Sequence, residues 1–192
     1  HRIPRIPIFI DSPLAIKATG LYRKHCDYLS GQARATAIVC EDLFKFPGVK
    51  FTLTTEESKS INGVLPPKVI LAGSGMSTGG RILHHERRYL SDPSSTLLVV
   101  GYQSPGTLGR TLLDGATEVK ISDEVINVQA KIQQISGYSA HADKHGLLNF
   151  VERTKETLEK VFVVQGEETA AEALTTSIRD HLGVDSIVPD YA

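Results

Sequence analysis

Residues 68–81 have the sequence KVILAGSGMSTGGR, which is the strongest indication of the fold. Its largely apolar beginning, 68–72, predicts a buried strand; the glycines predict a loop over 73–80, and a helix is expected over 81–90. The same order follows again along the chain, with a buried strand, a glycine-containing loop and a helix over 96–100, 101–109 and 110–113. Strand, loop and helix repeated in this way predict an α/β fold, in which helices pack on the faces of a parallel sheet.

The loop at 73–80 has the composition of an anion-binding loop. Its four glycines allow backbone N–H groups to approach a ligand closely, and the helix that follows directs the positive end of its dipole to the same place. Neither common nucleotide motif is present, because Arg81 and Ile82 follow Gly80 where a Walker A loop needs lysine, and Thr78 replaces a glycine of GxGxxG. Phosphate binding and a tight turn that serves only backbone packing both remain open interpretations.

The helix after the loop carries a run of basic residues. Arg81, His84, His85 and Arg88 are spaced as neighbours on one face, and Arg87 adds a further charge. The functional interpretation is contact with a phosphate backbone beside the loop. The alternative is a solvated helix face on which Glu86 offsets part of the charge.

Outside this region the pattern predicts one earlier unit and a change of structure near residue 116. The apolar run 6–10 predicts a strand that leads into a helix, with Ser12 as its N-cap and Pro13 in its first turn. Apolar residues at alternate positions between 119 and 135 predict antiparallel strands. The expected elements beyond them are helices over 142–151 and 168–182 and strands over 161–164 and 184–188.

His141 is the residue with the clearest potential for acid–base chemistry, because it is expected at a strand-to-helix junction. On a helix only His141 and His145 would converge, and two ligands do not make a metal site. Asp143 is interpreted as a charge at the helix N-terminus, and His181 as a partner of the dipole at a helix C-terminus.

The composition is that of a globular protein and excludes some classes. Of the 192 residues, 41% are hydrophobic and 22% are charged, and the formal net charge is −1. Any RNA site must therefore be built locally. No run approaches the roughly 18 apolar residues of a membrane span, and no signal peptide is recognised, so we expect no membrane contact and a cytoplasmic location. Cys26 and Cys40 are expected to be reduced thiols.

Five segments together resemble the β-CASP family of the metallo-β-lactamase superfamily, which includes RNA-processing ribonucleases. They are DSPLA at 11–15, GMSTGGR at 75–81, GYQSPGTLGR at 101–110, SAHAD at 139–143 and VQGE at 164–167. The resemblance extends over nearly the whole chain and is closest to the prokaryotic stand-alone members. It implies that 1–116 form most of a β-CASP domain. Residues 117–192 would then be the C-terminal strands and helices by which the chain returns into a metallo-β-lactamase αββα sandwich.

The resemblance also implies a function, the hydrolysis of RNA phosphodiester bonds by water that two zinc ions activate. His141 matches a family histidine that acts as general acid near the scissile phosphate. The loop matches the one that lines the RNA channel. The residues expected to bind RNA phosphate are Ser74, Gly75, Met76, Thr78, Gly79, Gly80, Arg81 and Ser139.

Two departures from the family pattern change what is expected of this chain. The HxHxDH motif is absent, and Gln165 is found where the family usually has a zinc-ligand histidine. We therefore expect zinc in a full-length parent but none bound to this chain, which would bind RNA weakly and not cleave it alone. Its expected partners are RNA and the missing N-terminal half, with a second copy, forming a homodimer, as a further candidate. The alternative hypothesis is a non-catalytic RNA- or partner-binding module that has lost the zinc site.

Overall fold

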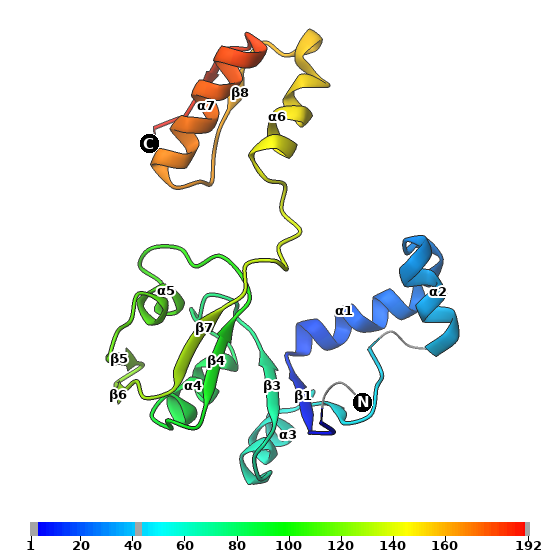
Figure 1. The fold of residues 1–192 in the computed structure, drawn as a ribbon, viewed down its shortest axis with the longest axis vertical. Helices are drawn as coiled ribbons and strands as arrows, with labels where there is room; N and C mark the ends of the chain where they lie inside the picture. The colour runs from blue at the N-terminus through cyan, green and yellow to red at the C-terminus, as the bar shows by residue number, and fades with distance from the viewer. Residues whose placement is uncertain (1–3, 41–43, 191–192) are drawn as a thin grey trace. The chain divides into compact units, whose positions relative to one another are not determined.

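The computed structural model describes residues 4–40 and 44–190, over which the chain forms two compact units (Figure 1). The first unit extends to Tyr138 and the second begins at Ser139. The family boundary expected near residue 116 is a different kind of division and stays a prediction. Within the described residues, no helix is both long and apolar enough to cross a bilayer.

The first unit contains the longer series of elements. They are β1 (Ile8–Asp11), α1 (Pro13–Lys24), η1 (Cys26–Tyr28), α2 (Gly31–Cys40), β2 (Val49–Phe51), α3 (Thr55–Ser60), η2 (Ile61–Gly63), β3 (Val69–Ala72), α4 (Ile82–Tyr89), β4 (Thr96–Val99), α5 (Leu108–Leu113), β5 (Glu118–Ile121), β6 (Glu124–Asn127) and β7 (Lys131–Gln134). Parallel strands with intervening helices confirm the predicted α/β class.

A three-stranded parallel sheet in the order β2-β1-β3 positions the beginning of the glycine-rich loop. Asp11, the last residue of β1, lies in register with Ala72, the last residue of β3. Ser12 caps α1 by accepting a hydrogen bond from the backbone N–H of Ala15, and Pro13 lies in the first turn, as predicted. Two chain segments that leave the sheet, at Ser12 and at Gly73, therefore start side by side.

The second part of this unit pairs β4 with β7 in parallel and β5 with β6 in an antiparallel hairpin. The antiparallel prediction for 119–135 is confirmed for β5 and β6 and is wrong for β7. The reason is long-range: the N–H groups of Gln129 and Ala130 donate to the carbonyl of Leu90, and Lys131 donates to Ser95, which aligns β7 with β4. A core packs between these elements and consists of Leu90, Leu112, Val119, Ile121, Ile126 and Ala130.

The prediction that the strands at 68–72 and 96–100 are buried is wrong for one of their faces. Val69 is 40% exposed, Leu71 48% and Leu98 46%. Alternate exposure along a strand is the pattern of a sheet with a single covered face. An apolar strand sequence does not reveal whether one layer or two will pack against it.

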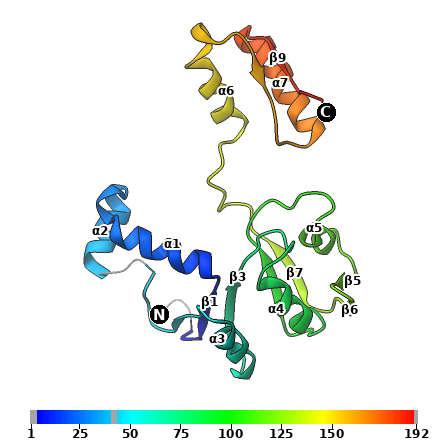
Figure 2. The ribbon, with the colours of Figure 1, turned by 180° about the vertical axis from the view of Figure 1, so that it is seen from behind.

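The second unit consists of α6 (Lys144–Glu152), η3 (Lys155–Thr157), β8 (Val161–Phe162), α7 (Glu168–Leu182) and β9 (Ser186–Ile187). Figure 2 shows α7 alongside the short parallel pair of β8 and β9. The core is built from Val151, Val163, Ala171, Ile178 and Val184. α7 has the predicted bounds, and Gly183 follows it as the C-cap. The φ of Gly183 is 67°, the left-handed conformation that glycine adopts without strain. Phe150, Phe162 and Val164 remain more than half exposed.

The core of the first unit gives a test of the fold. Leu112 is 0% exposed, so Leu112→Ala is expected to lower the free energy of unfolding by about 2–5 kcal/mol through lost burial and a residual cavity. Leu14→Ala is the matched control, because Leu14 on α1 is 79% exposed and its truncation should cost about 0.5 kcal/mol or less. Chemical denaturation followed by circular dichroism measures both, and equal losses would contradict the described core.

Candidate functional site at the glycine-rich loop

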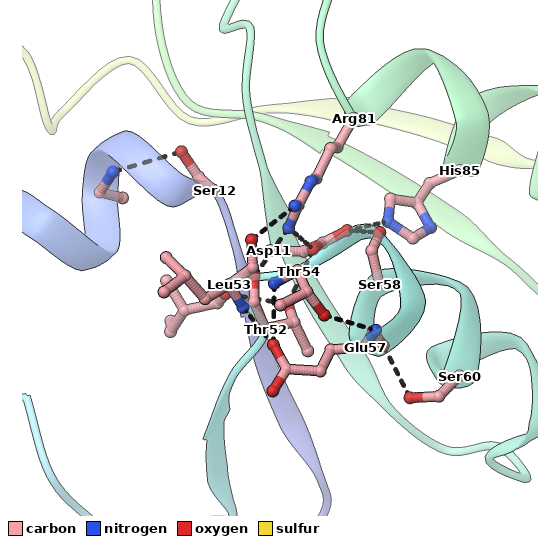
Figure 3. Close-up of polar contacts among 12 residues, drawn as sticks. Asp11, Ser12, Thr52, Leu53, Thr54, Glu57, Ser58, Ser60, Arg81 and His85 are labelled. Atoms are coloured by element: carbon pink, nitrogen blue, oxygen red, sulfur yellow. Dashed lines mark hydrogen bonds and ion pairs between the residues drawn. The ribbon is translucent and has the colours of Figure 1, made fainter.

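The carboxylate of Asp11 lies at the centre of a polar network that includes Arg81, the residue that follows the glycine-rich loop (Figure 3). Its side chain is completely buried and accepts four hydrogen bonds from side chains. Oδ1 accepts from Thr52 Oγ1 and from an Nη1 N–H of Arg81, both at 2.7 Å, and Oδ2 accepts from Ser58 Oγ at 2.6 Å and pairs with His85 Nε2 at 2.7 Å. The four partners come from three separate segments, so the carboxylate joins those segments to β1.

Arg81 extends the same network to the backbone. Its guanidinium also donates to the carbonyl oxygens of Thr52, at 2.7 Å, and Leu53, at 2.8 Å. Together with the bond to Asp11, these contacts use three of the five N–H groups of the side chain. Arg81 is the residue immediately before α4, and these bonds therefore attach the start of α4 to the connection between β2 and α3. That connection is itself ordered by the capping box of Thr54 and Glu57.

The network holds Asp11 in its charged form. Burial acts to raise the pKa of the carboxyl, but the hydrogen bonds from Ser58, His85, Thr52 and Arg81 outweigh it and hold the pKa below its ordinary value. An ionised carboxylate without solvent contact is stable only when its oxygen lone pairs are satisfied, as they are here.

The glycine-rich loop is closed by its own hydrogen bonds. Ser74 N–H donates to the carbonyl of Gly79 at 3.2 Å, Ser77 N–H to the carbonyl of Ser74 at 3.2 Å, and Thr78 N–H to Ser74 Oγ at 3.1 Å. None of the described residues accepts a hydrogen bond from the N–H groups of Gly75, Gly79 and Gly80. These unused donors, next to the N-terminus of α4, are the means by which the loop could bind an anion.

Two glycines of the loop differ in what they require. Gly80 has φ of 74°, and a Cβ there would approach the carbonyl oxygen of Gly73 to 2.6 Å, so the turn needs glycine. Gly79 has no atom within 4 Å of a Cβ position. A side chain at 79 would therefore point into open space at the loop without disturbing the backbone.

Gln103 supports the loop from the following glycine-containing segment. Its amide Nε2 donates to the carbonyls of Gly75 at 2.8 Å and Tyr102 at 2.9 Å, and the side chain is almost fully buried. The N–H of Gly109 also donates to the carbonyl of Met76, at 3.1 Å. The two glycine-containing loops that the sequence predicts separately are thus joined by two hydrogen bonds, both to carbonyl oxygens of the first loop.

A second buried carboxyl, Glu86, lies on the inner side of the loop. Ser77 Oγ donates to Glu86 Oε1 at 2.5 Å, and within the described residues Oε2 has no partner. Glu86 is 2% exposed, and this burial raises the pKa of its carboxyl despite the bond from Ser77. Ser77 itself has φ of 55°, a left-handed conformation that its bond to Glu86 helps to hold.

The structure places the predicted site residues in two groups. Seven of the predicted RNA-binding residues, from Ser74 to Arg81, form the loop or its end in the first unit. Ser139 and His141 belong to the second unit, where both are exposed and His141 N–H donates to Ser139 Oγ at 3.2 Å. Asp143 caps α6 by accepting from Gly146 N–H at 2.8 Å, which confirms its structural interpretation.

The expectation of one exposed basic face on the helix is wrong. Arg81 and His85 point to Asp11, and His85 is buried, whereas His84 and Arg88 are exposed. The cause is the Asp11 carboxylate, for which the sequence pattern predicted a place at a strand end and no role. The position of Asp11, a charged residue between a buried strand and Ser12-Pro13, was the one sign in the sequence of a buried charge. Nothing in the sequence marked Gln103 or Glu86 as buried.

The described residues do not fit a zinc site. No group of three or more His, Cys, Asp or Glu side chains lies close enough to hold a metal ion in the part of the chain that the structure describes. The pair of Asp11 and His85 is no exception, because both carboxylate oxygens already accept two hydrogen bonds each. Gln165, between β8 and α7, has φ of 61° and an amide in place of an imidazole.

The fold and the loop define an α/β protein with a glycine-rich loop at the carboxyl end of a parallel strand, where α/β proteins bind their ligands. Residues 1–112 match the Beta-Casp domain, and residues 125–189 match the Zn-dependent metallo-hydrolase RNA specificity domain. The chain belongs to the β-CASP family of the metallo-β-lactamase superfamily.

Several named proteins are similar to this chain. Ribonuclease TTHA0252 of Thermus thermophilus is 38% identical over 91% of this chain and 39% of its own length. Transcription termination factor FttA is 30% identical in Methanosarcina mazei and 31% in Thermococcus kodakarensis, in each case over 96% of this chain. The chain spans 30% and 29% of those two factors.

The Asp11 network predicts a specific dependence of stability on pH. A carboxylate whose pKa is lowered by folding contributes stability above its unfolded pKa of about 4, and this contribution is lost as the pH falls through the folded pKa. Asp11→Asn should remove that part of the acid sensitivity. At pH 7 it should also lower the free energy of unfolding by about 3 kcal/mol, because Arg81 and His85 lose a buried anionic partner.

Thermal and chemical unfolding between pH 3 and pH 7 measure this effect. Asp143→Asn makes the same chemical change at an exposed helix cap and should alter stability by less than about 1 kcal/mol. Parallel pH profiles for wild type and Asp11→Asn would show that the network does not contribute as described.

Proposed function

We propose that this chain is the RNA-binding portion of a zinc-dependent RNA-processing hydrolase. The observation that carries the proposal is the loop at 73–80. Its Gly75, Gly79 and Gly80 N–H groups are unused, and its backbone is held in place by hydrogen bonds with Gln103 and Glu86. The match to an RNA specificity domain and the similarity to a ribonuclease support RNA as the ligand.

In this proposal the loop binds a phosphate of the RNA backbone. Donors are the N–H groups of Gly75, Met76, Gly79 and Gly80, and the hydroxyls of Ser74 and Thr78 lie 3.0 Å apart on the exposed side. The N-terminus of α4 adds a partial positive charge. Arg81 acts mainly as a positioning residue here, because Asp11 and two carbonyls engage most of its guanidinium.

We propose His141 as the general acid and Ser139 as a second phosphate contact, both within the segment expected at 117–192. Both side chains are exposed at the beginning of the second unit, so a ligand can reach them. Zinc would supply the activated water in the complete protein. Among the described residues no three potential metal ligands lie together, and the part proposed for this chain is to bind and orient RNA and to donate a proton.

The second candidate is a non-catalytic RNA- or partner-binding module, which Gln165 favours because glutamine is a poor zinc ligand. Partners under either proposal are RNA and the remainder of the protein, with a second copy as the alternative. A cytoplasmic location is expected for both. A chelator-sensitive nuclease activity of the full-length protein supports the hydrolase, and RNA binding without cleavage supports the module.

Position 79 offers the sharpest test of the loop. Gly79→Asp is expected to weaken binding of a labelled single-stranded RNA at low salt at least about tenfold, because it adds a negative charge where the phosphate would lie. Gly79→Lys, at the same open position, should preserve or strengthen binding. Fluorescence anisotropy, titrated against salt, measures both.

The two variants occupy space that the wild type leaves empty, so equal thermal midpoints should confirm that neither alters the fold. Equal RNA affinity of Gly79→Asp and wild type would overturn the loop as the phosphate site. Arg81→Ala is a poorer test, since it also breaks the buried network around Asp11.

A further inference from the structure

A second polar hollow borders α4, on residues that do not belong to the loop. It has a volume of about 260 Å³ and is lined by Asn62, His84, Arg87, Arg88 and Glu124. All five side chains are polar, and three of them are basic. None belongs to the glycine-rich loop or to the network around Asp11, although His84, Arg87 and Arg88 belong to the basic run for which the sequence allows phosphate contact.

The one carboxylate in the hollow is already neutralised. Arg87 binds Glu124 through two of its nitrogens, with Nε at 3.1 Å from Oε2 and Nη2 paired with Oε1. This pairing orients the guanidinium and leaves its Nη1 unengaged among the described contacts. The exposed side chains of Arg88 and His84 then face a hollow with no free anion of its own.

Tyr89 orders the rim of the hollow. Its ring lies 5.2 Å from Lys68 Nζ and 5.9 Å from the guanidinium carbon of Arg88, and its hydroxyl donates to Asn62 Oδ1 at 3.3 Å. The Asn62 carbonyl is thereby satisfied, so its NH₂ group remains as a donor. Lys68 is held in turn by the carbonyls of Ile61 and Val64, both at 2.8 Å.

We propose that this hollow is a second phosphate-binding site, which holds the backbone of the same RNA strand beyond the glycine-rich loop. The inference rests on the proposed function. The available groups are the guanidinium of Arg88, the unengaged Nη1 of Arg87 and the amide of Asn62. All are donors, and the hollow has no unpaired carboxylate, which suits phosphate oxygens. Arg88 lies six positions after Ile82 on α4, about 9 Å along the helix axis, which a nucleic-acid strand covers in a few nucleotides.

Arg88 is the residue to change, because it is exposed and, among the described residues, its guanidinium takes part in no ion pair or hydrogen bond and interacts with the Tyr89 ring. Arg88→Ala should weaken binding of a single-stranded RNA about three- to tenfold. It should also reduce the slope of log affinity against log salt by about 0.7, the value for one lost phosphate contact. Arg88→Glu should weaken binding further. Arg34→Glu, which makes the same charge change on α2, is the matched control and should have little effect.

The outcomes separate this site from the loop. If Gly79→Asp weakens RNA binding and Arg88→Glu does not, the hollow is excluded and the proposed function stands. If neither changes binding, both proposals fail. If only Arg88→Glu does, the hollow binds RNA and the loop does not.

Two competitors distinguish sources of the anion. The first comparison asks whether inorganic phosphate stabilises the wild type against thermal unfolding but does not stabilise Arg88→Glu. If it does, and that variant also keeps its RNA affinity, the hollow binds free phosphate and the RNA proposal is overturned. Polyglutamate that binds as tightly as RNA in an Arg88-dependent manner would overturn it in favour of an acidic protein partner. Equal unfolding midpoints of Arg88→Ala and wild type in the absence of ligand serve as the control for folding.

Discussion

One buried negative charge, the carboxylate of Asp11, holds together the segments that frame the glycine-rich loop. Removing it from water is costly, and only the complete set of donors from Thr52, Ser58, Arg81 and His85 offsets that cost. Since these donors come from the end of β2, from α3 and from both sides of the start of α4, satisfying the charge aligns all three. The glycine-rich loop begins and ends within this frame, which explains how a loop of small residues keeps a defined shape.

The local elements were predictable because their causes are local. Ser12 and Pro13 start α1, the glycines break the chain after β3, and the spacing of apolar residues gives α7 its predicted bounds. The direction of β7 was not predictable, because it depends on hydrogen bonds to Leu90 and Ser95 from residues more than 30 positions later. The number of layers on the sheet is equally a property of tertiary packing.

The same distinction explains the candidate site. Its loop was predictable from composition, since four glycines lie between a predicted strand and a predicted helix. Its supports were not, because Asp11 lies 70 and 74 positions from the basic residues it binds. Arg81 and His85 therefore looked like solvent-exposed charges. Gln103 and Glu86 were missed for the same reason, as a polar residue in a sequence gives no sign of whether it is buried.

The packing of Gln103 against Gly109 has a consequence for how sequences of this kind can diverge. A Cβ at Gly109 would overlap the Oε1 atom of Gln103 and come within 3.2 Å of the Met76 carbonyl. Gln103 cannot simply move aside, because its amide holds the Gly75 carbonyl. A side chain at 109 therefore requires Gln103 to be displaced or exchanged for a smaller residue, and either change would loosen its hold on the Gly75 carbonyl. The side chain at 103 and the space at 109 are therefore coupled, so that a change at one of the two positions is expected to require a change at the other.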